Sequence, residues 1–301
     1  MKPTKTKINL DELLTLCDTR LQTMFSHYVQ EIPSLELKTA MKYNLFNGGK
    51  HLRPLLIYAT GSIFDAPLEN LDIPASSVEL IHTYSLIHDD LPCMDNADLR
   101  RGKPTSHKVY GEGMAVLTGD ALHTLATQII ASHPTPLNAD RRLQMIKVLS
   151  HACGPFGMAA GQALDITVMN DDIISTDLLI DIYRLKTGAL FAACIELGRL
   201  ASTDDDDTNQ RALKEFGDCI GLAFQIQDDI LDMETPTALL GKPQGIDAKN
   251  KKVTYPKLCG LIEAKTKVQS LYQEALEAIN YLGYQAKLLR DLAGHMLQRN
   301  Q

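Results

Sequence analysis

The stretch Phe224-Gln225-Ile226-Gln227-Asp228-Asp229-Ile230-Leu231-Asp232 decides the fold class, because it sets an acidic face into an otherwise apolar helical run. At 100° per residue, its first glutamine and its three aspartates fall within one stripe about 100° wide. No Lys or Arg stands four residues further on to neutralise these carboxylates. Clustered like charges are unfavourable unless a cation compensates them, so the stretch predicts a helix that offers carboxylates to a metal ion. The alternative is a solvated acidic face.

Helical periodicity continues on both sides of this stretch and predicts an all-α fold. The apolar segments are Leu10–Ile32, Leu35–Phe46, Pro54–Phe64, Ser76–Leu91, Met114–Ser132, Asp140–Cys153, Thr176–Leu200, Thr208–Met233 and Tyr255 to the carboxyl end. Period-two alternation is scarce, so we expect few or no strands. No linker, repeat or composition shift divides residues 1–301, which predicts a single domain of ten or more helices.

Charge and cysteine usage narrow the class of protein. The formal net charge is −7 and no long basic stripe is present, which argues against a nucleic-acid partner. The six cysteines are scattered and form no C-x-x-C pair, a pattern typical of free thiols in a reducing compartment. The amino terminus is polar, and no run approaches the ~18 apolar residues that a membrane span needs. These features predict a cytoplasmic protein without a membrane anchor.

Another acidic cluster lies earlier in the chain; it is called the first acidic cluster below, and the stretch at 224–232 the second. Asp89 and Asp90 end one predicted helix, and Asp95 follows five residues after Asp90. Pro92 disfavours a helical conformation at Leu91, so the chain should leave the helix there and let Asp95 fold back. Two such clusters on apolar helices predict a Mg²⁺ site, whereas either cluster alone is equally consistent with a solvated face. The denser run at 204–207 lacks apolar flanks and predicts a solvated, helix-capping loop.

Basic residues stand where a bound diphosphate would need them. Arg100-Arg101-Gly102-Lys103 follows the first acidic cluster, and Gly49–Pro54 precedes a helix start; ion pairing with the neighbouring carboxylates is the alternative role. Lys186-Thr187-Gly188 interrupts an apolar helix and predicts a kink. His82 lies two turns before Asp89 on the same helical face. The irregular stretch at 235–254 carries four lysines and predicts either a lid over an anion or a solvated loop.

Five motifs in this order resemble the isoprenyl diphosphate synthase family. They are Gly-Gly-Lys-His-Leu-Arg-Pro (48–54), Asp-Asp-Leu-Pro-Cys-Met-Asp (89–95) with Leu-Arg-Arg-Gly-Lys-Pro-Thr (99–105), Lys-Thr-Gly (186–188), the acidic stretch at 224–232, and Lys-Val-Thr-Tyr-Pro (252–256). The resemblance implies a helical bundle around a deep central cavity, the isoprenoid synthase fold, with the two acidic motifs facing each other. It also implies a homodimer, and isopentenyl and allylic diphosphates as substrates.

The resemblance assigns roles residue by residue. Asp89 and Asp95 would bind two Mg²⁺ ions and Asp228 a third, with Mn²⁺ as the alternative metal. The allylic diphosphate would be held by Arg100, Lys186 and Lys242, and isopentenyl diphosphate by Lys50, Arg53, His82 and Arg101. Thr187, Gln225 and the carbonyl of Lys186 would face the allylic carbocation. Asp90 joins the catalytic set and Lys252 the substrate-binding set. Ala97 replaces a further aspartate of many relatives, and Lys251 replaces a glycine.

Product length depends on what fills the cavity below Asp89. Tyr84, five residues earlier, is bulky and Ser85 is small. An aromatic residue there, together with the inserted Pro92-Cys93, resembles bacterial farnesyl diphosphate synthases, so we predict a C15 product. The alternatives are a C20 or C10 synthase, a non-catalytic subunit, which would tend to lose an acidic motif, and a terpene cyclase, which would need no isopentenyl site.

Overall fold

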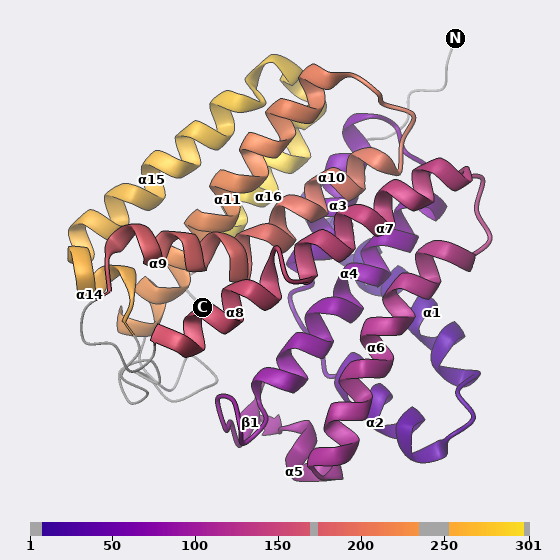
Figure 1. Cartoon of the computed structure of the whole chain (residues 1–301). Helices are drawn as coiled ribbons and strands as arrows, with labels where there is room; N and C mark the ends of the chain where they lie inside the picture. The colour runs from indigo at the N-terminus through magenta and orange to yellow at the C-terminus, as the bar shows by residue number, and fades with distance from the viewer. Residues whose placement is uncertain (1–7, 169–173, 235–252, 298–301) are drawn as a thin grey trace.

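The computed structural model describes residues 8–168, 174–234 and 253–297 (Figure 1). Its elements are α1 (Leu10–Gln30), α2 (Leu35–Leu45), α3 (Leu52–Ile63), α4 (Leu68–Asp89), β1 (Leu99–Arg100), β2 (Lys103–Pro104), α5 (Ser106–Tyr110), α6 (Glu112–Ser132), α7 (Ala139–Cys153), α8 (Met158–Val168), α9 (Thr176–Tyr183), η1 (Arg184–Gly188), α10 (Ala189–Leu200), α11 (Asp207–Glu234), α14 (Tyr255–Cys259), α15 (Leu261–Ala278), η2 (Asn280–Ala286) and α16 (Lys287–Leu297). The described residues therefore contain more than ten helices, which confirms the all-α prediction.

The helices pack as a bundle with α10 and α3 near its middle (Figure 1). On one side of them α11 pairs with α15, and on the other side α4 pairs with α6. A large apolar core joins the helices of the amino-terminal half to α10, and a smaller one lies beneath α9, α11 and α15. The long central helices thus form a rigid frame for the polar residues at their ends.

Most predicted helix boundaries agree with the structure to within two residues, but three regions differ. Helix α4 begins at Leu68 and passes through Pro74, because buried packing on both sides outweighs the backbone hydrogen bond that proline removes. Helix α8 was not predicted at all. The carboxyl-terminal segment is not one helix, since Gly260 (φ 88°) and Gly283 (φ 55°) break it in the left-handed region.

A short hairpin follows the first acidic cluster. Strands β1 and β2 pair antiparallel, with Leu99 opposite Pro104 and Arg100 opposite Lys103. The two turn residues both have positive φ, 52° at Arg101 and 75° at Gly102, as a tight hairpin turn requires. Because the turn fixes the register, it also sets where the two arginine side chains emerge.

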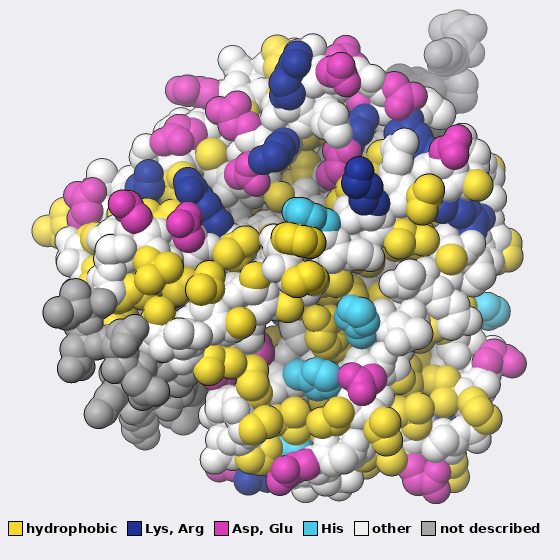
Figure 2. All heavy atoms as spheres, in the orientation of Figure 1, with side chains coloured by type: hydrophobic (Ala, Val, Ile, Leu, Met, Phe, Trp, Pro, Cys, Tyr) yellow, Lys and Arg dark blue, Asp and Glu magenta, His cyan; other side chains and the backbone are white. Residues whose placement is uncertain are grey.

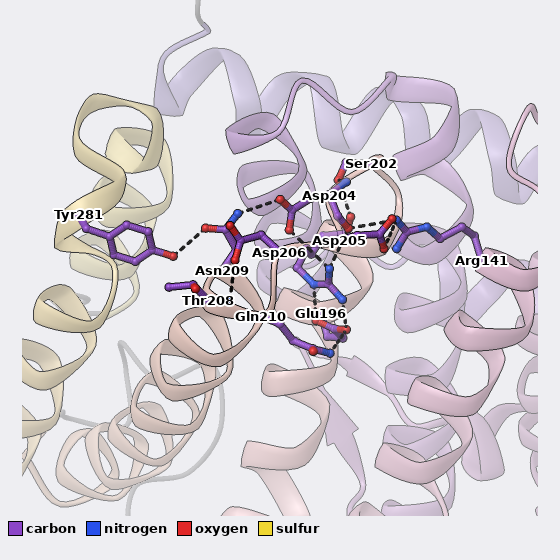
Figure 3. A network of polar contacts seen from close by, with 11 residues as sticks. Arg141, Glu196, Ser202, Asp204, Asp205, Asp206, Thr208, Asn209, Gln210 and Tyr281 are labelled. Atoms are coloured by element: carbon purple, nitrogen blue, oxygen red, sulfur yellow. Dashed lines mark hydrogen bonds and ion pairs between the residues drawn. The ribbon is translucent and has the colours of Figure 1, made fainter.

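The acidic run at 204–207 differs from its predicted role in one respect. Asp206 accepts a hydrogen bond from the Thr208 amide at 2.7 Å, which confirms helix capping. Asp204, however, is not solvated: its side chain is 12% exposed and accepts from Asn209 Nδ2 at 2.8 Å and from the buried Arg199 at 3.5 Å (Figure 3). Glu196 holds the same guanidinium through two further hydrogen bonds. The network joins α10 to α11.

We expect Asp204→Ala to lower the free energy of unfolding by about 1–3 kcal/mol, because it removes an acceptor from a buried guanidinium. Asp205→Ala is the matched control, since that side chain is 82% exposed and its ion pair with Arg141 should contribute less than about 1 kcal/mol. Urea denaturation of both variants measures the difference. Equal losses would contradict the assignment of a structural role to Asp204 alone.

Candidate active site

The centre of the site is η1, a π-helical turn over Arg184–Gly188 inserted between α9 and α10. It confirms the predicted interruption at Lys186–Gly188, in the form of a π-helix rather than a simple kink. Two glycines let neighbouring helices approach it: a Cβ added to Gly161 of α8 would lie 2.2 Å from the Lys186 backbone nitrogen, and one on Gly221 of α11 would lie 2.8 Å from the Gly188 Cα. The turn is therefore clamped between α8 and α11.

We expect Gly161→Ala to displace η1 and to reduce kcat/KM about 100-fold, because small misplacements of reacting groups have effects of this size. The clash is with backbone and cannot be relieved by a side-chain rotation, so the unfolding free energy should also fall by about 1–3 kcal/mol. Gly113→Ala in α6 is the control, because nothing lies within 4 Å of its added Cβ. Steady-state kinetics and thermal unfolding check both effects, and an unimpaired Gly161→Ala enzyme would contradict the clamp.

The first acidic cluster folds as the proline predicts. Helix α4 ends at Asp89, and the chain turns back so that the Asp95 amide donates to the Asp89 carbonyl at 2.9 Å. Burial raises the pKa of Asp89 to about 6; Asp95 adds to the rise, whereas Lys186 opposes it. Burial disfavours the charged form of this carboxyl group, and a bound cation would strongly stabilise that charged form.

Asp90 has a different role from its neighbour. Its side chain is buried and accepts two hydrogen bonds from Arg100, Nε to Oδ2 and Nη2 to Oδ1, both at 2.7 Å. This fork-like pairing fixes the plane of the guanidinium beside the acidic cluster. Arg100 retains a 34% exposed side chain, so it is both held and accessible. The structure thus places Asp90 as a positioning residue for Arg100.

Lys186 links η1 to the first acidic cluster. Its positive charge acts on the Asp89 carboxyl, and its Nζ donates to Asp165 Oδ2 at 2.6 Å. Asp165 lies buried on α8 and was missed from the sequence, although a single aspartate in the apolar run Met158–Val168 was a usable indication. We read Asp165 as the group that orients Lys186.

The second acidic cluster is tied to η1 through one glutamine. Thr187 Oγ1 donates to Gln225 Oε1 at 2.7 Å, and Gln225 Nε2 donates to Asp229 Oδ1 at 3.2 Å. Asp229 also accepts from the hydroxyl of Tyr183 and, at 3.2 Å, from the amide of Tyr255. These bonds fix the orientation of the Gln225 amide. Asp229 is therefore held by hydrogen bonds to three neighbouring residues. Asp228 beside it is half-buried and is the carboxylate nearer the surface.

The residues predicted to hold isopentenyl diphosphate also converge. Arg101 donates to the carbonyl of Gly48, and a Cβ on Gly49 would lie 2.9 Å from the same guanidinium. Arg53 Nη1 donates to His82 Nε2 at 3.3 Å, and the guanidinium carbon of Arg53 lies 4.9 Å from the centre of the Phe191 ring. Burial and the charge of Arg53 hold the pKa of His82 well below its usual range, so it is a neutral acceptor.

Glu79 is a buried carboxylate beside this basic group and was not predicted as a site residue from the sequence. It is 3% exposed, and its Oε1 lies 3.0 Å from His51 Nδ1. Burial alone would raise its pKa, but the hydrogen bond with His51 and the positive charges of His51 and Arg53 lower it to about 2. A buried carboxylate among such cations compensates part of their repulsion. Its position inside an apolar run hid it in the sequence.

Other predicted residues have simpler environments. Lys50 is exposed at the start of the basic group. Tyr84 and Ser85 lie half-buried on α4, one to two turns before Asp89. Lys242, Lys251 and Lys252, with the predicted lid, lie outside the described residues. A small, partly open pocket adjoins the site and is lined by residues of α2, α4 and the hairpin, including Asn47, Asp90, Arg100 and Arg101.

The donor set fits Mg²⁺ bound together with a phosphate. Among the described residues, no group of three or more His, Cys, Asp or Glu side chains stands ready to enclose a metal ion. Mg²⁺ does not need such a cage, because one or two carboxylates, waters and substrate phosphates complete its shell. Asp89, Asp95 and Asp228 could supply the carboxylates, and Arg100 and Lys186 the cations for a phosphate.

Comparisons with known proteins agree with this geometry. The model of the polyprenyl synthetase family matches residues 34–284. The chain is 42% identical over 300 residues to the farnesyl diphosphate synthase of Escherichia coli K12, covering 98% of this chain and 100% of that protein. It is 43% identical over 248 residues to a chloroplastic geranylgeranyl pyrophosphate synthase of Arabidopsis thaliana, covering 81% of this chain and 69% of that protein. The structure of the Helicobacter pylori geranyltransferase complexed with magnesium and isoprenyl diphosphate superposes with a TM-score of 0.81 at 33% identity, covering 95% of this chain and 96% of that one.

Proposed function

Because the chain belongs to the polyprenyl synthetase family and is a prenyltransferase, we propose that it condenses isopentenyl diphosphate with dimethylallyl or geranyl diphosphate to make farnesyl diphosphate. The single observation that carries this proposal is that residues of both acidic clusters interact with η1. One five-residue turn presents Lys186 to the first acidic cluster and Thr187 to the glutamine of the second. The similarity to farnesyl diphosphate synthase over nearly the whole chain supports the C15 product.

In the proposed reaction, Arg100 and Lys186 bind the allylic diphosphate and stabilise the charge that grows on it as the C–O bond breaks. Mg²⁺, held by Asp89, Asp95 and Asp228, would supply further charge stabilisation to the leaving diphosphate. Asp90 and Asp165 keep the two cationic side chains in place. The Gln225 carbonyl oxygen and the Thr187 hydroxyl, which are hydrogen-bonded to each other, would face the allylic carbocation with their dipoles.

Isopentenyl diphosphate would bind at the second basic group. Lys50, Arg53 and Arg101 hold its diphosphate, with neutral His82 between them as a hydrogen-bonding partner. Binding there directs the double bond toward the allylic carbon, which forms the new C–C bond. The released diphosphate then accepts the proton lost from the adjacent carbon, so no protein base is required.

We assign the end of the product pocket to Tyr84, which lies about 7.5 Å before Asp89 along the helix axis. Tyr84→Ala should therefore shift the product from C15 to C20 or longer, while the rate of the first condensation changes by less than about tenfold. The measurement is sizing of dephosphorylated products from labelled isopentenyl diphosphate. Ser85→Ala, which alters the neighbouring small side chain, is the control and should retain C15. A Tyr84→Ala enzyme that stops at C15 would disprove this assignment.

The function itself is tested by incubating the purified protein with Mg²⁺, labelled isopentenyl diphosphate and either allylic diphosphate. We expect a chelator-sensitive C15 product. A C20 product would favour the geranylgeranyl synthase alternative, with which the similarity to the Arabidopsis enzyme is consistent. No product at all would favour a non-catalytic subunit, and cyclised hydrocarbon without isopentenyl incorporation would favour a terpene cyclase.

We further propose a homodimer joined through α6 and its neighbours. The face of the molecule in Figure 2 shows hydrophobic side chains gathered over this region. The exposed apolar residues of these helices are Val109 of α5, Val116 and Leu117 of α6 and Leu143 of α7, each more than a third exposed. Apolar clusters of this kind mark association surfaces. Light scattering measures the mass in solution.

We also propose a cytoplasmic location, which rests on the cysteines. All six are free thiols in the structure, as a reducing compartment would keep them. No described helix combines the length and the apolar composition that a bilayer crossing requires.

A further inference from the structure

The ring of Tyr84 is held by a histidine from a different helix. His123 of α6 lies 4.9 Å from Tyr84 between ring centres, with the rings nearly perpendicular at 87°. Edge-to-face aromatic pairs of this geometry are attractive beyond the area they bury. A second histidine, His88, contacts Tyr84 from one turn further along α4 at 5.6 Å and 79°. The Tyr84 ring therefore makes edge-to-face contacts with two histidines, His123 of α6 and His88 of α4.

His123 is itself anchored. Its Nε2 lies 3.8 Å from the Sγ of Cys153, a buried thiol on α7. Burial raises the pKa of this thiol, so the sulfur keeps its proton and can donate it weakly to the imidazole. His88 is anchored as well, because its Nε2 lies 3.2 Å from the Val116 carbonyl of α6, above the bare Gly119. A chain of contacts thus runs from α7 through α6 to the ring on α4.

We propose that His123 is a specificity-determining residue, which positions Tyr84 and thereby sets the length of the prenyl product. This inference rests on the proposed function and deepens it. A half-buried tyrosine side chain has more than one rotamer. If the product pocket ends at Tyr84, as the proposed function assigns it, the pocket is closed only while the ring lies across its end. His123 approaches from the helix that faces α4, so its contact favours one rotamer over the others. Without it, the ring can swing aside and admit a longer chain.

The expected effect is a change in product distribution rather than in stability. His123 is exposed, so truncating it should leave the thermal midpoint nearly unchanged. Loss of one edge-to-face pair corresponds to about a two- to tenfold change in a conformational equilibrium. We therefore expect His123→Ala to raise the ratio of C20 to C15 product about two- to tenfold, with Tyr84→Ala as the upper limit. His123→Phe, which restores a ring, should return the ratio toward that of the wild type.

The experiment measures C20 to C15 ratios for the full-length enzyme with geranyl diphosphate and excess isopentenyl diphosphate. His151→Ala is the matched control, because that exposed histidine stacks on Phe156 at 5.6 Å and not on Tyr84. A raised ratio in His123→Ala, unchanged in His151→Ala and reversed in His123→Phe, supports the inference. A wild-type ratio in His123→Ala while Tyr84→Ala lengthens the product overturns it and leaves the proposed function intact. If Tyr84→Ala also stays at C15, both the stop assigned to Tyr84 and this inference fail.

Discussion

Replacing Asp89 by asparagine should lower kcat about 1000-fold, because it removes a carboxylate that we assign to the metal ion beside the leaving diphosphate. The side chain keeps its size, and burial already disfavours the charged form, so the unfolding free energy should not fall. Steady-state rates at saturating substrate, measured over a range of Mg²⁺ concentrations, give the effect. The loss should persist at high Mg²⁺, since the variant binds the reactive complex in the wrong arrangement.

Asp98→Asn is the control for this experiment. Asp98 lies in the segment that follows α4 and carries the same charge as Asp89. Its side chain is 77% exposed and forms an ion pair with Lys108. It should keep nearly full activity. If the two substitutions reduce kcat equally, the effect would come from net charge near the site and not from a metal ligand.

Replacing Lys186 by glutamine should reduce kcat/KM for the allylic substrate about 100- to 1000-fold, because it removes the cation that we assign to the developing negative charge. It also removes the ion pair with the buried Asp165 carboxylate at 2.6 Å, which should destabilise the fold by about 1–3 kcal/mol. The double variant Lys186→Gln with Asp165→Asn separates these effects. It should recover stability and not activity.

Lys214→Gln is the matched control for loss of a lysine, because that residue forms an exposed i,i+4 ion pair with Asp218 at 2.5 Å. Its kinetics should match the wild type. Recovery of full activity in the double variant would show that Lys186 acts only by neutralising Asp165, and that outcome would contradict its assignment to the diphosphate.

The fold could be predicted from the sequence because helical periodicity is strong wherever a helix buries one side. Prediction failed where the local pattern was weak or misleading. Helix α8 follows Gly154 and Gly157 and carries Gly161, so its sequence reads as irregular, yet those small residues allow close packing on η1. Pro74 lies inside α4 because tertiary packing overrides the local penalty.

The site residues were found from the sequence when their chemistry was clustered. Clustered charge makes the two acidic motifs recognisable in the sequence, and broken helical periodicity does the same for Lys-Thr-Gly. Glu79 and Asp165 do not, since each is a lone carboxylate in an apolar run whose partner is distant in sequence. The division of labour between Asp89 and Asp90, or Asp228 and Asp229, also depends on hydrogen-bond partners that only the folded chain defines.

We infer that both acidic motifs bind one Mg²⁺–allylic diphosphate complex, and calorimetry with an unreactive thio analogue of dimethylallyl diphosphate tests this inference most directly. Titrations are run with and without Mg²⁺ on the wild type, Asp89→Asn and Asp228→Asn. We predict Mg²⁺-dependent binding that is weakened at least tenfold by either substitution, since the motifs act on the same ligand. Binding that is independent of Mg²⁺, or unaffected by the loss of one of the two motifs, would contradict the account.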